Sequence, residues 1–175
     1  MIPEHGNIDI IRFQSTADLQ ALLAEHLPWC DMLIMAAAVS DFTPVVPEDC
    51  QETKWRRGED APVLELRPTP DLLRGCADRA RGDQTLVGFA LEPHETLESS
   101  ALRKLERKNI DYIVANPLET MDADRIAATI YARGGEPVAS TQGPISKQTF
   151  AAWLLDNLEK ASAVTLRECR TSHRT

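Results

Sequence analysis

Residues 31–39 read DMLIMAAAV, and this run decides the fold class. After its first aspartate the run is apolar without alternation, which is typical of a central parallel strand buried on both faces of a sheet. Four other segments have the length and composition of strands: residues 8–13 (IDIIRF), 63–67 (VLELR), 85–91 (TLVGFAL) and 111–115 (DYIVA). Helical patterns separate them, and strands that alternate with helices predict an α/β domain with a mostly parallel sheet.

The segments between these strands contain helix start signals. Residues 94–108 are rich in Glu early and in Arg and Lys late, which suits a helix dipole. Three more helices are expected to begin at capping residues, namely Ser15 or Thr16, then Thr69 with Pro70 in the first turn, then Ser146. The second of these helices is predicted to run to about residue 80. The last one presents an apolar side made of Phe150, Trp153, Leu154 and Leu158.

Three other segments are not helical in pattern. Residues 42–62 combine prolines with mixed charges and little periodicity, so they predict a long mobile loop of the kind that is usually functional or disordered. Residues 126–131 and 136–140 flank Gly134-Gly135 and predict a terminal β-hairpin. Residues 1–165 are therefore expected to form one domain, and residues 166–175 a polar tail that frays from residue 167.

Composition excludes several classes of protein. The 175 residues carry 19 Lys and Arg against 27 Asp and Glu, a net charge of −8, which argues against nucleic-acid and anionic-membrane binders. No apolar run is long enough for a membrane span, and the first residues do not have the pattern of a signal peptide. The four scattered cysteines favour reduced thiols over zinc or disulfides, and hence a cytoplasmic protein.

Ligands of parallel sheets bind beyond the carboxyl ends of the strands, so the residues that follow each strand are the candidates. After residues 31–39, the small side chains of Ala36, Ala37 and Ala38 would let a planar ring approach the backbone. Asp41 could then hold a ribose hydroxyl or Mg²⁺. The alternative is that the alanines relieve crowding against a helix and Asp41 caps a turn.

Four other places are candidates for binding anions or rings, each with a structural alternative. Lys54, Arg56 and Arg57 could stabilise a triphosphate, or be a solvated part of the loop. The helix start at Thr69-Pro70-Asp71-Leu72-Leu73 could present backbone N–H groups, although such starts are common. Phe89 could stack on a base or belong to the core. Lys104 and Lys108 share one helix face, either for a phosphate or as a solvated helix end.

Taken in order, six of these stretches closely resemble the phosphopantothenate–cysteine ligase family of coenzyme A biosynthesis. They are AAAVSDF, KWRR, LELRPTPDLL, LVGFALE, LRKLERKNIDYIVAN and PISKQTFAAWLLDNL. In many bacteria this ligase is the C-terminal half of a bifunctional flavoprotein. The resemblance extends from about residue 8 to about residue 158. It implies a Rossmann-like three-layer fold with a mostly parallel sheet, a long flap loop and a terminal hairpin, assembled as a homodimer.

The resemblance also implies a reaction. A nucleoside triphosphate, CTP in most bacteria and ATP in some others, is used with Mg²⁺. The carboxylate of 4′-phosphopantothenate attacks the α-phosphate and releases pyrophosphate, and the amine of cysteine then displaces the nucleoside monophosphate. A decarboxylase domain is a possible partner, and FMN is expected only if such a domain lies upstream.

Site residues carry over position by position. The flap lysine that helps to turn over the acyl-nucleotidylate matches Lys54, and the aspartate of the nucleotide and metal site matches Asp41. The strand end that reads the base in the family matches Met35, Ala36 and Ala37, and the Pro-Asp helix start matches Pro70, Asp71, Leu72 and Leu73. The aromatic residue at a strand end matches Phe89. The two lysines that bind the nucleotide match Lys104 and Lys108.

The chain departs from the family pattern in two places. Pro93 stands where relatives have threonine, and it should shift the start of the following helix. The family's N-terminal strand, its Gly-Gly-Thr turn and its Ser-Ser-Gly stretch do not precede residue 8. We therefore expect either a fragment with a misplaced start or a degenerate protein that needs another chain. The competing hypotheses are a non-catalytic nucleotide-binding or interaction module and a generic NAD(P)-binding protein. The latter is disfavoured because no G-x-G-x-x-G follows a strand.

Overall fold

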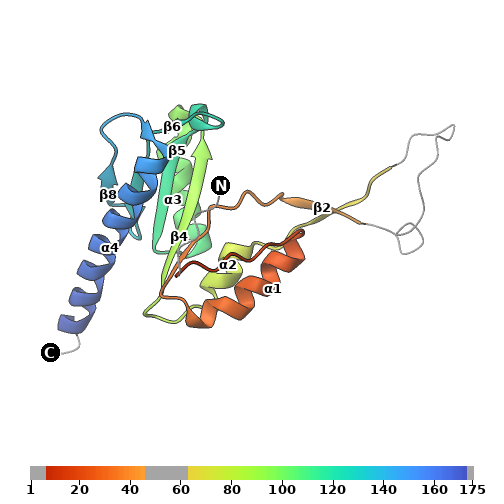
Figure 1. Ribbon diagram of the computed structural model, residues 1–175, viewed down its shortest axis with the longest axis horizontal. Coiled ribbons are helices and arrows are strands. Elements are labelled where there is room, and N and C mark those ends of the chain that lie inside the picture. Colours follow the sequence, from red (N-terminus) through yellow and green to blue (C-terminus); the bar gives the residue numbers. More distant parts are fainter. Residues whose placement is uncertain (1–6, 46–62, 173–175) are drawn as a thin grey trace.

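A computed structural model describes residues 7–45 and 63–172 of the chain (Figure 1). Its centre is a five-stranded sheet in the order β1-β4-β5-β7-β8. The strands are β1 (Met32–Ile34), β4 (Thr85–Glu92), β5 (Tyr112–Pro117), β7 (Thr129–Ala132) and β8 (Pro137–Ser140). The pairs β1–β4 and β4–β5 are parallel, whereas β5–β7 and β7–β8 are antiparallel. The predicted hairpin is thus confirmed, and it extends the sheet.

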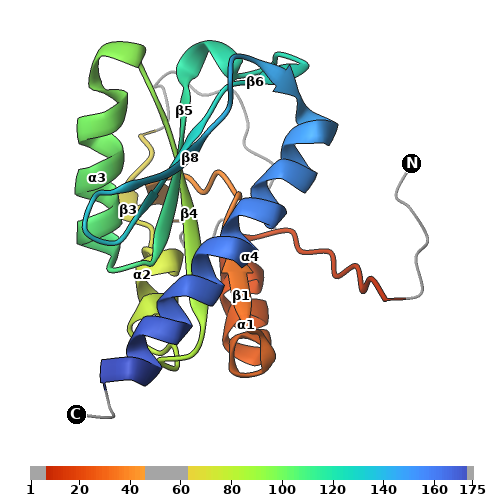
Figure 2. The ribbon, with the colours of Figure 1, turned by 90° about the vertical axis from the view of Figure 1, so that its left-hand side faces the viewer.

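Helices cover both faces of this sheet (Figure 2). One face packs against α2 (Leu72–Ala77) and α3 (Leu97–Lys108), with Leu23 of α1 (Thr16–His26) at the margin. The other face packs against α4 (Lys147–Ser172) through Phe150, Leu154 and Leu158. The structure therefore has the three α/β/α layers that the family resemblance implies.

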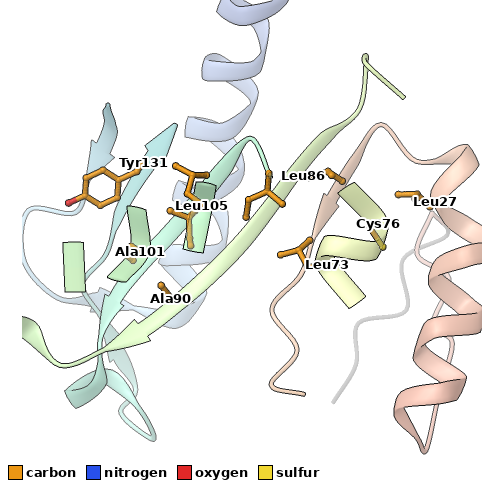
Figure 3. Packing of buried hydrophobic residues seen from close by; sticks show 11 residues of the cluster. Leu27, Leu73, Cys76, Leu86, Ala90, Ala101, Leu105 and Tyr131 are labelled. Atoms are coloured by element: carbon orange, nitrogen blue, oxygen red, sulfur yellow. The ribbon is translucent and has the colours of Figure 1, made fainter. Parts of the chain in front are cut away.

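The two faces follow from alternation along the strands. In β4, Leu86 and Ala90 belong to the α2/α3 side, whereas Val87 belongs to the α4 side, as expected when successive side chains point to opposite faces. Figure 3 shows Leu73 and Cys76 of α2 facing Leu86 of the sheet. Gly88 lies at the tightest point, since an added Cβ would lie 2.8 Å from Ile110 Cδ1 and 2.9 Å from Leu73 Cδ2.

The first residues of the segment predicted as a long loop form one strand of a two-stranded antiparallel ribbon. β2 (Phe42–Pro44) pairs with β3 (Leu66–Pro68), which confirms a strand near residues 63–67 but assigns it to this ribbon and not to the central sheet. Figure 1 shows the ribbon projecting from the rest of the domain. Lys54, Arg56 and Arg57 lie outside the described residues. A second small pair joins β6 (Arg125–Ile126) to β9 (Ile145–Ser146), and short 3-10 helices lie at Leu27–Trp29, His94–Thr96 and Leu118–Thr120.

Helix ends largely follow the sequence signals. Ser15 caps α1 in a reciprocal capping box with Asp18, and the Ser146 hydroxyl accepts the Thr149 N–H at 3.0 Å at the start of α4. Asn109 ends α3 in the left-handed region at φ 53°. The start of α3 at Leu97, after a 3-10 turn that follows Pro93, agrees with the expected shift. None of the helices in the described part of the chain combines the length and hydropathy that a membrane span requires.

Two strand predictions are wrong. Residues 8–13 form no strand; Ile8, Ile10, Ile11 and Phe13 are about half exposed, because no strand among the described residues lies beside this segment to accept its backbone hydrogen bonds. The run at residues 31–39 is not a central buried strand either. Only Met32–Ile34 pair, and they form the edge of the described sheet with half-buried side chains.

Three boundaries also differ from prediction. Asp71, and not Thr69, caps α2, so Pro70 precedes the helix, which ends at Ala77. β5 includes Asn116 and Pro117, which were expected to end it. α4 continues through Ser172 because no glycine or proline interrupts it, so the expected frayed tail is helical to that point.

Candidate functional site

A cleft opens where the chain leaves the carboxyl end of β1. Its volume is about 190 Å³, and segments far apart in the sequence line it: Met35, Ala37, Val39, Ser40, Asp41, Thr69, Pro70, Asp71, Leu72, Leu73, Phe89, Arg107 and Lys108. Sites that enclose a drug-sized ligand usually measure about 300–1,000 Å³. The cleft that the described residues form is therefore smaller than such sites.

The backbone after β1 shapes the first side of the cleft. The Met35 N–H donates to the Val87 carbonyl at 2.9 Å, which continues the contact with β4 for one residue beyond the strand. After Met35 the chain diverges from β4, and Ala36, Ala37 and Ala38 are exposed. Their small side chains leave the main chain accessible, as a ring that reads backbone groups would require.

The base of the β2–β3 ribbon fixes the second side. The Thr69 N–H donates to the Asp41 carbonyl at 2.9 Å, and the hydroxyls of Thr43 and Thr69 lie 2.7 Å apart. These two contacts hold the segment that follows β1 against the segment that leads into α2. Asp41 is thereby fixed at the mouth of the cleft with its carboxylate exposed.

Asp71 connects the third side, α2, to α3. One of its oxygens accepts the Arg74 N–H at 3.1 Å and so caps α2, and the two oxygens lie 2.8 and 2.9 Å from Lys108 Nζ. Partial burial raises the pKa of Asp71, but the hydrogen bonds from Lys108 and the Arg74 backbone outweigh it. With the charges of Lys108 and Arg107, they leave the pKa below its ordinary value. Asp71 therefore stays ionised beside the ammonium group.

Arg107 is a cleft residue that sequence reasoning missed. Arg103 and Arg107 are also four residues apart, so this spacing alone groups Arg107 with Arg103 on a neighbouring part of the helix surface. However, Lys104, Arg107 and Lys108 stand at positions i, i+3 and i+4, and this spacing places all three on adjoining parts of one helix surface. The Arg107 carbonyl also accepts Arg74 Nη1 at 2.9 Å, so α2 and α3 are joined at this point by a second contact.

The structure does not bring every predicted residue to the cleft. Ala36 is exposed beside it but does not line it, and Lys54 lies outside the described residues. Lys104, one helical turn before Lys108, does not line the cleft either. Its Nζ lies 2.5 Å from Glu92 Oε1 at the end of β4, and both side chains are about three-quarters buried.

The described residues do not form a complete metal site. Among residues 7–45 and 63–172, no group of three or more His, Cys, Asp or Glu side chains could hold a metal ion. Of the two aspartates that line the cleft, Asp71 contacts Lys108, so Asp41 is the one that could supply a carboxylate oxygen. That still fits Mg²⁺, because this ion usually keeps several waters and takes one or two carboxylates together with substrate phosphates.

A larger cavity of about 420 Å³ lies elsewhere, between the end of α3 and the β7–β8 turn. Leu102, Leu105 and Ile110 give it an apolar lining. Arg133 at its rim donates to Asn109 and Asp111. None of the predicted site residues lines it, so size alone does not locate the chemistry.

Comparison with known proteins now decides the family. The protein-family model described as the DNA/pantothenate metabolism flavoprotein C-terminal domain matches residues 1–161. The chain belongs to this family. Among its curated relatives, the coenzyme A biosynthesis bifunctional protein CoaBC of Bacillus subtilis is 34% identical over 134 residues. These residues cover 74% of this chain and 32% of that protein.

Two other proteins are similar over comparable stretches. A cysteine/cysteine sulfinic acid decarboxylase from an unknown prokaryotic organism is 39% identical over 117 residues, covering 67% of this chain and 32% of that protein. The DNA/pantothenate metabolism flavoprotein from Streptococcus pneumoniae superposes with a TM-score of 0.68 at 25% identity, over 91% of this chain and 74% of that one. The chain thus spans about a third of the length of the curated relatives that it matches.

Proposed function

We propose that this chain carries the nucleotide site of a phosphopantothenate–cysteine ligase, which joins 4′-phosphopantothenate to cysteine through an acyl-cytidylate made from CTP. The observation that carries the proposal is the cleft itself. Strand-end backbone, an aspartate, a helix N-terminus, an aromatic ring and a lysine, all expected at a nucleotide site, come together there from separate segments. Family membership supports the same assignment.

Each residue has a distinct task in this proposal. The exposed backbone at Met35 and Ala37 reads the edge of the base, and Phe89 stacks on the base or ribose. Lys108, with Arg107 beside it, meets the phosphates, where a cation stabilises the charge that develops as pyrophosphate leaves. Asp41 holds Mg²⁺, which when bound neutralises phosphate charge. Lys104 reaches a phosphate only by leaving Glu92.

The carboxylate of 4′-phosphopantothenate must be activated before the amide bond can form. A carboxylate is a poor acyl donor until one of its oxygens becomes part of a phosphate leaving group. We assign Lys54, on the strength of the family resemblance, to the second half-reaction, in which the amine of cysteine displaces CMP. A homodimer, also implied by the resemblance, is part of the proposal, and sedimentation equilibrium would test it.

The test is pyrophosphate release by the chain with CTP, Mg²⁺, 4′-phosphopantothenate and cysteine, with parallel reactions lacking each component. We expect release that depends on CTP and on phosphopantothenate, and we expect Lys108→Ala to suppress it. Absence of release from a chain that still binds CTP in calorimetry would favour the non-catalytic nucleotide-binding module instead. Use of ATP in place of CTP would correct the choice of nucleotide.

A further inference from the structure

The ammonium group of Lys108 is engaged by a carboxylate at the cleft. Both carboxylate oxygens of Asp71 lie within hydrogen-bond distance of Lys108 Nζ, at 2.8 and 2.9 Å. Only about a quarter of the Lys108 side chain is exposed, whereas the Asp71 side chain is 41% exposed. A four-carbon lysine stem would otherwise sample many rotamers, so this double contact decides where the charge lies.

The position of Asp71 is itself fixed from two directions. Its Oδ1 accepts the Arg74 N–H, which ties the carboxylate to the first turn of α2. Arg74 in turn reaches the last turn of α3 through the Arg107 carbonyl and forms an ion pair with Asp78 at 2.9 Å. The carboxylate is therefore held by a helix start that is braced against the helix carrying Lys108.

We propose that Asp71 is a positioning residue: its carboxylate holds the Lys108 ammonium at the cleft wall, where the remaining N–H donors can meet an anionic group of the ligand. This inference rests on the proposed function for the identity of that ligand, a nucleoside triphosphate. Asp71 thus has two separable tasks, since capping α2 needs only a side-chain oxygen, whereas fixing Lys108 needs a carboxylate.

Asp71→Ser separates the two tasks. Serine caps helices about as well as aspartate, but its short hydroxyl cannot span the distance to Lys108. The first readout needs no ligand: the rate at which an acylating reagent modifies Lys108, followed by peptide mass spectrometry. We expect the rate to rise about fivefold in the variant, the factor that corresponds to a partly exposed ion pair. Lys104, paired with Glu92, serves as the internal control and should not change.

The second readout is CTP affinity in the presence of Mg²⁺. We expect Asp71→Ser to weaken binding by about three- to tenfold, the effect of losing one positioned charge, in a variant that stays folded although loss of the ion pair lowers its unfolding temperature slightly. An unchanged acylation rate at Lys108 would overturn the inference. Equal or tighter CTP binding would also overturn it, because it would mean that the carboxylate merely opposes the incoming anion.

Two further outcomes keep the inference separate from the proposed function. If the wild-type chain binds no CTP, the proposed function fails, and the acylation rate alone decides whether Asp71 fixes Lys108. If Asp71→Ser does not fold, Asp71→Asn replaces it, because asparagine is an equally good cap without the charge. An acylation rate at Lys108 that does not rise in this second variant contradicts the inference.

Discussion

Lys104 Nζ lies 2.5 Å from Glu92 Oε1, so the last residue of β4 holds a lysine of α3 outside the cleft that Lys108 enters. The two lysines are one helical turn apart and are equivalent in the sequence pattern. In the structure they have different carboxylate partners, from different elements. Asp71 keeps Lys108 at the cleft, whereas Glu92 draws Lys104 toward the carboxyl end of β4.

This difference predicts unequal effects of removing the two lysines. Lys108→Ala should weaken CTP binding by about 10- to 100-fold, since a hydrogen bond to a charged group contributes about 1.5–3 kcal/mol. Lys104→Ala should weaken it by clearly less, because Lys104 must first leave Glu92. Isothermal titration calorimetry measures both, with the exposed Lys160→Ala on α4 as control. Equal losses from both lysines would show that Lys104 leaves Glu92 when the nucleotide binds.

A second prediction concerns acid stability. The pKa of Asp71 is lower in the folded chain than its ordinary value, so its contribution to stability is present above the unfolded pKa of about 3.9 and is lost as the pH falls through the folded value. Asp71→Asn should therefore lower the unfolding temperature near neutral pH, and the difference from wild type should shrink below about pH 4. Thermal scans at several pH values measure it. A difference that does not depend on pH would contradict the assigned cause.

The glycine of β4 gives a third prediction. A methyl group at position 88 would lie under 3 Å from two buried side-chain ends, those of Leu73 and Ile110. Gly88→Ala should therefore destabilise the domain by about 1–3 kcal/mol through overpacking between α2 and β4. Gly75→Ala is the matched control, because nothing lies within 4 Å of its added Cβ and alanine favours the interior of α2. Urea denaturation should show opposite signs for the two variants.

The elements that could be predicted from the sequence are those whose local sequence pattern agrees with the tertiary contacts they make. The strand β4, the helices α3 and α4, and the hairpin of β7 and β8 combine strong periodicity with clear end signals, and the structure confirms them. The cleft followed from topology, because residues after parallel strands converge at one edge of a sheet. Asp41 and Phe89 were predicted in this way, and Lys108 was predicted from its helix position and the family resemblance; all three line the cleft.

The failures have a common physical cause, which is dependence on a neighbour that the local sequence does not specify. Residues 8–13 have a strand composition, but a strand also needs a partner, and none lies beside them in the described part of the chain. The cap at Asp71 was missed because Thr69 is an equally good capping residue, and its hydroxyl instead meets Thr43 of the ribbon. That Lys104 does not line the cleft could not be predicted either, because its pairing with Glu92 joins two elements.

The last prediction concerns Lys54, which lies in the sequence between the two ribbon strands. If its ammonium acts on the acyl-cytidylate, Lys54→Ala should leave CTP affinity nearly unchanged and slow the displacement of CMP by cysteine. The intermediate should then accumulate in single-turnover reactions followed by rapid quench and mass spectrometry. Lys54→Arg keeps the charge and should restore part of the rate if charge stabilisation is the cause. Loss of all CTP binding in Lys54→Ala would instead assign this lysine to holding the nucleotide in the ground state.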